Sequence, residues 1–306
     1  MVFRYKKEWY SKAFGEVLLS RHRRLILKGG RGSGKTRHII LKLVARTFYK
    51  GHVAIYYCRN YFETIRKNTF NDIVNFFKSC PELAEYFEFS DKPNSSMIFT
   101  NKLTGNKMYP FGLDDPDNTK GISEATEVWV DEMDKCTLPQ VMAIDAVLRT
   151  PQAEYLQFIG SFNPVSEKSW VKSFYFDEDG INPHPKFNKD EILIHHSTVY
   201  DNEFIDVEAY VRNLMLMYGY SQNLINVNVH GMWGIEENDN PWFTAFNHER
   251  HVSKTIIEPY RNLPIYVSMD FNTDPMCAIV GQHSQIFNQS SWCHILKEYK
   301  INLPKK

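Results

Sequence analysis

The chain has 306 residues, of which 36 are basic and 36 acidic, so its formal net charge at pH 7 is zero. This length predicts one large domain with a smaller second part. The zero net charge excludes a protein that coats nucleic acid through a global positive field, but it allows a local basic groove. The five cysteines are dispersed without a CxxC pair, and no stretch resembles a signal peptide or a membrane span. We therefore expect a soluble cytoplasmic protein with reduced thiols.

A glycine-rich octapeptide, GGRGSGKT, follows the apolar run LIL near the N-terminus. The stretch after it, residues 36–50, places its apolar residues on one side of a helix, so the octapeptide lies between a predicted strand and a predicted helix. It fits the G-x-x-x-x-G-K-[ST] pattern, in which backbone N–H groups and the positive helix N-terminus surround the phosphates of a nucleotide. The predicted nucleotide-binding residues are Gly29, Gly30, Arg31, Gly32, Ser33, Gly34, Lys35 and Thr36. Lys35 is expected to reach the β- and γ-phosphates of ATP, and the Thr36 hydroxyl is expected to bind Mg²⁺.

Strand and helix patterns alternate through the rest of the first 230 residues. Strands are predicted at residues 53–59, 128–132, 155–164 and 192–198, with a hairpin over 97–112. Helices are predicted at residues 61–88, 138–148 and 207–219. This alternation predicts an α/β fold with a mostly parallel sheet that is flanked by helices on both faces.

Two carboxylates, Asp131 and Glu132, follow the short strand VWV. A carboxylate at the C-terminal edge of a parallel strand lies beside the phosphate crevice, so Asp131 is predicted to hold the Mg²⁺ ion and its waters. Glu132 points elsewhere and is predicted to act as the general base that polarises a water toward the γ-phosphate. A solvated acidic turn is the alternative interpretation of DEMD, residues 131–134.

Asn163 and several arginines are further candidates. Asn163 lies in GSFNP at the end of a strand, where its amide can sense a phosphate, although Asn-Pro is equally typical of a plain turn. Arg31, Arg59 and Arg66 are candidates for the positive charge that stabilises the transition state of phosphoryl transfer. Most arginines are solvated surface residues, so the sequence does not choose among the three.

The pattern changes beyond residue 230. Residues 230–243 are rich in glycine, proline and acids and are typical of a connector, while 264–283 and 292–301 predict successive strands of a hairpin or meander. Asp270 and Asp274 lie in the first of these stretches. Such a pair can begin a two-metal site that cuts phosphodiesters, although it is more often part of a turn.

Taken in order, seven segments resemble the large terminase subunit of tailed bacteriophages over nearly the whole chain. They are GGRGSGKT, CRNYFETIR, KGISEATEVWVDE, GSFNP, HSTVYDNEFI, HGMWG and YVSMDFNTDP. The resemblance implies a P-loop NTPase domain over residues 1–230, a linker over 231–245 and the N-terminal part of an RNase H-like nuclease domain over 246–306. Because that nuclease needs further acidic residues downstream, the resemblance implies an incomplete nuclease, from a truncated chain or a split gene.

The resemblance also implies a task and partners. It implies an ATP-hydrolysing motor that moves double-stranded DNA into a procapsid in the host cytoplasm, and a full-length protein that also cuts concatemeric DNA with Mg²⁺ or Mn²⁺. The implied partners are a portal protein and a small terminase subunit, with either a homo-oligomeric ring on the procapsid or a monomer in solution, and no membrane.

Carried over by residue, the resemblance makes Lys35 and Thr36 the phosphate and Mg²⁺ contacts, Asp131 the metal-associated acid and Glu132 the catalytic base. Residues 160–163 become the motif that couples hydrolysis to movement. Arg31 or Arg59 becomes the charge sensor. Asp270 matches the first metal-binding aspartate of the nuclease.

Two other functions remain open from the sequence. A helicase-like ATPase also combines a P-loop with an Asp-Glu pair, but it would carry a second motor domain, and nothing after Ser197 has that pattern. A nucleotide-dependent scaffold that switches without hydrolysis would not need Glu132. ATP hydrolysis by wild type and by Glu132→Ala separates the scaffold from the two enzymes.

Overall fold

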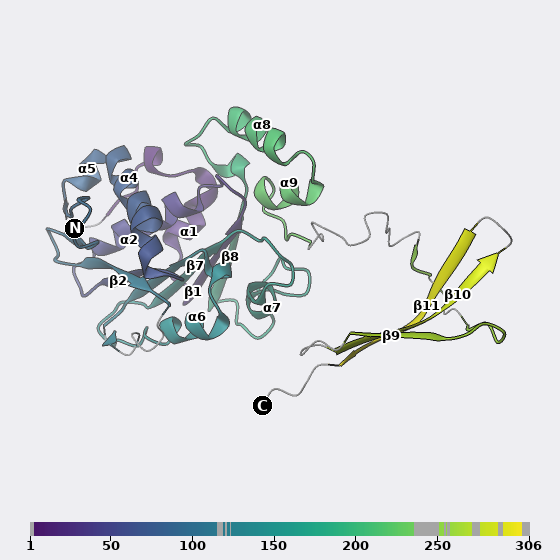
Figure 1. The fold of residues 1–306 in the computed structure, drawn as a ribbon. Helices are drawn as coiled ribbons and strands as arrows, with labels where there is room; N and C mark the ends of the chain where they lie inside the picture. Colours follow the sequence, from purple (N-terminus) through teal and green to yellow (C-terminus); the bar gives the residue numbers. More distant parts are fainter. Residues whose placement is uncertain are drawn as a thin grey trace. The chain divides into compact units, whose positions relative to one another are not determined.

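The computed structural model describes residues 3–114, 119, 121–122, 124–235, 251–253, 255, 258–270, 276–286 and 290–301. The chain divides into two compact units, Met1–Glu237 and Asn238–Lys306. Figure 1 shows a central sheet with helices in the first unit and a small all-β sheet in the second.

An eight-stranded sheet forms the centre of the first unit, in the order β3-β4-β5-β2-β6-β7-β1-β8. Its strands are β1 (Arg24–Gly29), β2 (Ala54–Arg59), β3 (Phe87–Glu88), β4 (Phe99–Asn101), β5 (Lys107–Gly112), β6 (Glu127–Asp131), β7 (Gln157–Phe162) and β8 (Ile192–Ser197). All neighbours from β5 to β8 in this order are parallel, whereas β3, β4 and β5 pair antiparallel at one edge. The predicted α/β fold with a mostly parallel sheet is confirmed.

Helices cover both faces of this sheet. They are α1 (Gly15–Leu19), α2 (Lys35–Thr47), α3 (Phe62–Ile65), α4 (Asn71–Ser79), α5 (Pro81–Ala84), α6 (Leu138–Asp145), α7 (Trp170–Tyr175), α8 (Val207–Tyr218) and α9 (Gln222–Asn228). Alternation along β1 sends Leu25 and Leu27 into the core under α2 and α4 and sends Ile26 into the core under α6 and α7. None of the helices in the described part of the chain combines the length and apolarity needed to cross a bilayer.

The predicted helix over residues 61–88 is correct only in part. It is divided into α3, a π-helical segment (Arg66–Phe70), α4 and α5, and the chain then enters β3. Pro81 lies in the first turn of α5, where its missing N–H and fixed φ suit the start of a new helix rather than the continuation of α4. The predicted hairpin over residues 97–112 is confirmed, because Phe99 of β4 pairs antiparallel with Met108 of β5.

The sequence did not predict α9, which reads QNLINVN and is rich in poor helix formers. Ser221 caps this helix by accepting a hydrogen bond from the Leu224 N–H. Ile225 packs with Leu214 of α8 in a small separate core. Tertiary packing and a cap therefore stabilise a helix that local propensity does not favour.

The described residues of the second unit form three antiparallel strands, β9 (Tyr266–Asp270), β10 (Met276–Ile286) and β11 (Ser290–Ile301), in the order β11-β10-β9. The predicted succession of strands in a meander is confirmed. Asp270 ends β9 opposite Cys277, but its side chain and all of Asp274 lie outside the described residues. The nuclease metal site expected at Asp270 therefore stays a prediction.

Candidate active site

The glycine-rich octapeptide connects the end of β1 to the start of α2, as predicted. Gly34 immediately precedes α2 and has a φ of 89°, a left-handed conformation that favours glycine. The loop is fixed from outside by backbone bonds, from the Gly30 N–H to the Ser197 carbonyl (3.3 Å) and from the Arg31 N–H to the Asn228 carbonyl (2.8 Å). The end of β8 and the end of α9 therefore hold the base of the loop.

Asn202 also holds this loop, and sequence reasoning missed it. Its buried side-chain amide donates to the Gly32 carbonyl at 2.7 Å. The residue lies in HSTVYDNEFI, shortly after β8, and a polar amide next to a strand end was the available signal. Only the tertiary structure shows that this amide faces the glycine loop across 170 residues of sequence.

Lys35 is a buried lysine whose ammonium group points into the glycine loop. Its Nζ donates to Gly29 O (2.8 Å), Gly30 O (3.0 Å), Ser33 Oγ (3.1 Å) and Asn163 Oδ1 (3.1 Å). Burial lowers the pKa of Lys35 to about 7, and the nearby carboxylates of Asp131 and Asp134 oppose this shift. The four oxygen acceptors favour the charged form, so the site is built to hold an ammonium next to Asn163.

Asp131 ends β6 and is held by two hydroxyl groups. Thr69 Oγ1 donates to its Oδ2 and Ser161 Oγ donates to its Oδ1, both at 3.1 Å. Ser161 is itself fixed, because the Trp129 indole donates to its Oγ at 2.9 Å. Burial raises the pKa of Asp131, while Arg59 and the two hydroxyl donors lower it. The carboxylate is therefore oriented by groups from three different parts of the fold.

Glu132 and Arg59 form an ion pair at the C-terminal ends of β6 and β2, two central strands of the sheet. Glu132 has a φ of 51°, an uncommon value for a residue other than glycine, and its side chain is 57% exposed. The buried Arg59 guanidinium pairs with Glu132 through NH2, and its Nε lies 3.9 Å from Asp131 Oδ2. Backbone strain at such a position favours a functional interpretation. Arg66 lies elsewhere and donates to the carbonyls of Lys92 and Ser95.

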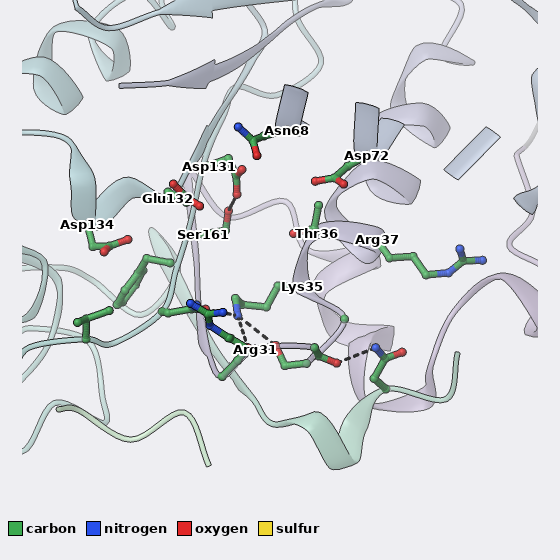
Figure 2. A pocket seen from close by; sticks show the side chains of 18 of the residues that line it. Arg31, Lys35, Thr36, Arg37, Asn68, Asp72, Asp131, Glu132, Asp134 and Ser161 are labelled. Atoms are coloured by element: carbon green, nitrogen blue, oxygen red, sulfur yellow. Dashed lines mark hydrogen bonds between the residues drawn. The ribbon is translucent and has the colours of Figure 1, made fainter. Parts of the chain in front are cut away.

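One cavity of about 840 Å³ brings most of the predicted residues together (Figure 2). Its lining includes residues 30–36 of the glycine loop, with Arg59, Asp131, Glu132 and Asn163. Gly29 ends β1 just below this lining, and Asp270 belongs to the second unit. In Figure 2, Lys35 and Thr36 lie on one side of the cavity and Asp131, Glu132 and Ser161 on the other.

The cavity also contains polar residues that the sequence did not single out. Among them are Asn68, Asp72, Asn202 and Tyr210. Asp72 comes from α4, and burial together with the Asp131 carboxylate raises its pKa to about 6. Asn68 belongs to the π-helical segment, a local geometry that recurs at functional sites. Because α4 and this segment carried only an apolar helical signal, their polar faces gave no sign of a site.

The donor set suits a magnesium ion that is bound together with a nucleotide. The described residues contain no group of three or more His, Cys, Asp or Glu that could hold a metal ion by itself. Thr36 and Asp131 both line the cavity and offer the hard oxygen ligands that Mg²⁺ prefers. Mg²⁺ usually takes only one or two protein ligands and fills its other positions with phosphate and water oxygens. These two side chains fit that pattern.

Comparison with known proteins identifies relatives of one kind. The family model described as phage terminase large subunit matches residues 21–232. The PBSX phage terminase large subunit of Bacillus subtilis (strain 168) is 25% identical over 222 residues, 68% of this chain and 49% of that protein. The large terminase subunit of Bacillus phage SPP1 is 25% identical over 199 residues, 62% of this chain and 44% of that protein. The chain thus spans about half the length of the curated relatives it matches.

Solved structures show the same fold. The large terminase of a thermophilic bacteriophage has a TM-score of 0.60 and 21% identity, covering 96% of this chain and 68% of that one. The complex of the same terminase with ADP has a TM-score of 0.60 and 20% identity with the same coverage.

Proposed function

Because the chain belongs to the phage terminase large subunit family, we propose that its first unit hydrolyses ATP with Mg²⁺ and uses the energy to move double-stranded DNA into a procapsid. The observation that carries the proposal is one cavity that is lined by both Lys35 and the strand-end pair Asp131 and Glu132. A phosphate-binding lysine, a metal-associated acid and a general base are the parts that phosphoryl transfer to water requires. The ADP complex of the thermophilic phage terminase, which shares this fold, supports nucleotide binding as part of the proposal.

Binding of the triphosphate follows from the loop. Backbone N–H groups of residues 30–36 and the N-terminus of α2 attract the phosphate oxygens. The Lys35 ammonium exchanges loop oxygens for β- and γ-phosphate oxygens, which also favours its charged form over the neutral amine. Thr36 and Asp131 would hold Mg²⁺, which supplies positive charge that stabilises the phosphate oxygens during transfer.

Hydrolysis requires Glu132 to leave Arg59. In the proposed step, a water oxygen forms a bond to the γ-phosphorus, the bond from this phosphorus to the bridging oxygen of ADP breaks, and Glu132 accepts the water proton. The ion pair with Arg59 holds Glu132 away from this task, and its partly exposed side chain is free to turn toward the cavity. Arg59 then keeps its position beside Asp131 and stabilises that carboxylate.

ATP turnover by purified variants tests this assignment. Glu132→Gln should reduce kcat by about 10²- to 10⁴-fold, the usual contribution of a general base, while ADP binding is retained. Lys35→Ala should lose nucleotide binding itself. Glu85→Gln is the matched control, because Glu85 is an exposed acid that does not line the cavity. Wild-type turnover in Glu132→Gln would show that the base is another residue, and an inactive wild type would favour the scaffold function.

The DNA task is the finer part of the proposal, and family membership supports it. We propose double-stranded DNA, a portal protein and a small terminase subunit as partners, in a ring on the procapsid within the host cytoplasm. Double-stranded DNA should then stimulate ATP turnover, whereas an ATPase that does not act on DNA should show the same turnover with and without it. The helicase alternative predicts strand separation of a labelled duplex, which a packaging motor should not perform.

The domain limits remain part of the proposal. We propose an ATPase domain over residues 1–230, a linker over 231–245 and the first part of an RNase H-like nuclease over 246–306. In that second part Asp270, at the end of β9, would bind Mg²⁺ or Mn²⁺. Limited proteolysis with mass spectrometry of the fragments tests the limits. Cleavage should concentrate in the later part of this linker, between residues 236 and 245, because Gly231 and Gly234 are packed and bonded against the first unit.

A further inference from the structure

The segment of residues 230–235, called the strap below, passes directly beneath the glycine loop. Gly231 has a φ of 63°, and a Cβ there would lie 2.8 Å from the Gly30 nitrogen and 2.9 Å from the Gly29 Cα. His230 is fixed beside it, since its carbonyl oxygen lies 3.0 Å from His196 Nε2 of β8. The strap therefore packs against the base of the phosphate loop more closely than any side chain would permit.

The other end of the strap is bonded to the opposite wall of the cavity. The Gly234 N–H donates to the Pro164 carbonyl at 2.8 Å, and the Glu167 N–H donates to the Gly234 carbonyl at 2.7 Å. This bonded loop starts at Asn163, whose Oδ1 accepts from Lys35 Nζ. The strap thus connects the two loops between which the Lys35 to Asn163 bond is formed.

A buried clamp fixes the strap between these two ends. The Trp233 indole and Lys28 Nζ both donate to the Gly180 carbonyl, at 2.8 and 2.9 Å. Lys28 Nζ also lies 5.3 Å from the Trp233 ring and 5.6 Å from the Phe176 ring, within the range of cation–π attraction. Trp233 packs against Phe162, the last residue of β7, at 5.5 Å between ring centroids. The clamp therefore involves β1 and β7, two of the strands whose C-terminal ends lead into the cavity.

The lysine in this clamp is informative because burying its charge costs desolvation free energy that an apolar side chain would not cost. Lys28 is 4% exposed and immediately precedes Gly29 on β1. Burial lowers the pKa of Lys28 to about 8, so burial opposes the charged form of this side chain. A buried lysine that fixes a tryptophan and a carbonyl in direction, despite the desolvation of its charge, indicates a role in positioning.

We propose that the strap sets the spacing between the glycine loop and the Asn163 loop, with Lys28 and Trp233 as positioning residues for ATP hydrolysis. This inference rests on the proposed ATPase function. Because the strap packs against the glycine loop and is bonded to the Asn163 loop, its displacement would move both walls of the cavity. Lys28 and Trp233 act through the strap and do not line the cavity themselves.

The first experiment separates positioning from stability. Lys28→Met should lower kcat for ATP by about 10- to 100-fold, the effect expected of small misplacements, with an unchanged or higher Tm. Trp233→Phe keeps an aromatic ring but loses the hydrogen bond to the Gly180 carbonyl, so its kcat should fall less than that of Lys28→Met. Lys6→Met is a control for the loss of a lysine beside an indole at an exposed position, because Lys6 Nζ lies 5.0 Å from the Trp9 ring and Lys6 does not line the cavity. Wild-type kcat in Lys28→Met would overturn the inference.

The second experiment uses ADP binding and needs no turnover. Gly231→Ala should weaken the binding of a fluorescent ADP analogue at least about tenfold, because its Cβ displaces the glycine loop. Gly105→Ala is the control, since Gly105 also has a positive φ, 76°, but nothing lies within 4 Å of its Cβ position. Circular dichroism confirms folding of both variants. Equal affinities of Gly231→Ala and Gly105→Ala for the ADP analogue would overturn the inference. If the two affinities differ but wild type does not hydrolyse ATP, only the proposed hydrolysis is refuted.

Discussion

Two hydroxyl groups, of Ser161 and Thr69, orient Asp131, and only the first of these two also accepts a hydrogen bond from a buried indole. Ser161→Ala and Thr69→Val each remove one hydrogen bond to the carboxylate. Ser161 also accepts a hydrogen bond from the fully buried Trp129 indole. Within the part of the chain that the structure describes, the Thr69 hydroxyl donates to Asp131 and accepts no comparable bond. The two variants should therefore have the same effect on Asp131 but different effects on stability.

The magnitudes follow from these contacts. A hydrogen bond to a charged group contributes about 1.5–3 kcal/mol, and both variants lose one. Ser161→Ala also leaves the Trp129 N–H buried without a partner, which costs about 1–3 kcal/mol more. We therefore expect the free energy of unfolding of Ser161→Ala to lie about 1–3 kcal/mol below that of Thr69→Val. Urea unfolding followed by far-UV circular dichroism measures the difference.

The pH dependence follows from the pKa of Asp131, which burial already raises and both hydroxyl donors lower. Removing either donor raises this pKa further. The acid limb of the ATPase profile should therefore move to higher pH in both variants, because Asp131 must be ionised to hold Mg²⁺. A carboxyl whose pKa is raised on folding contributes stability below its unfolded pKa and loses it as pH rises through the folded pKa. The stability deficit of both variants should thus grow from acidic to neutral pH.

Two results would contradict this reasoning. Equal unfolding free energies for the two variants would mean that the Trp129 indole does not depend on Ser161. An acid limb that shifts in one variant only would mean that the two hydroxyl groups do not act on the same carboxylate.

Three further predictions concern other contacts. Arg46→Met leaves Glu127, 1% exposed, without its ion-pair partner and should lower the free energy of unfolding by about 3–5 kcal/mol, measured by urea denaturation. Arg31→Ala should bind ATP normally but turn it over slowly in steady-state kinetics, and unchanged kcat would return Arg31 to an ordinary loop residue. Asn202→Ala removes the bond to the Gly32 carbonyl and should raise KM for ATP about fivefold, the equivalent of about 1 kcal/mol, with kcat little changed.

The sequence alone determined the features that depend on near neighbours in the chain. The glycine loop needs glycine at a left-handed position such as Gly34 and a lysine at a fixed spacing along the chain. GGRGSGKT could therefore be identified as a phosphate-binding loop from the sequence. The location of Asp131 and Glu132 could be predicted for the same reason, because an apolar strand that ends in acids places them at the carboxyl edge of a parallel sheet. The alternation of strands and helices was enough to predict that sheet.

Tertiary structure decided the contacts between distant segments. The pairing of Arg59 with Glu132, the hydroxyl of Thr69 on Asp131 and the amide of Asn202 on Gly32 join residues that lie 62 to 170 positions apart in the chain. No periodicity encodes such partners, because each depends on where a folded backbone places two otherwise ordinary polar residues. The strap gives the same lesson: HGMWG is a glycine-rich connector in the sequence, and only the fold brings Gly231 under the phosphate loop and Trp233 over Lys28.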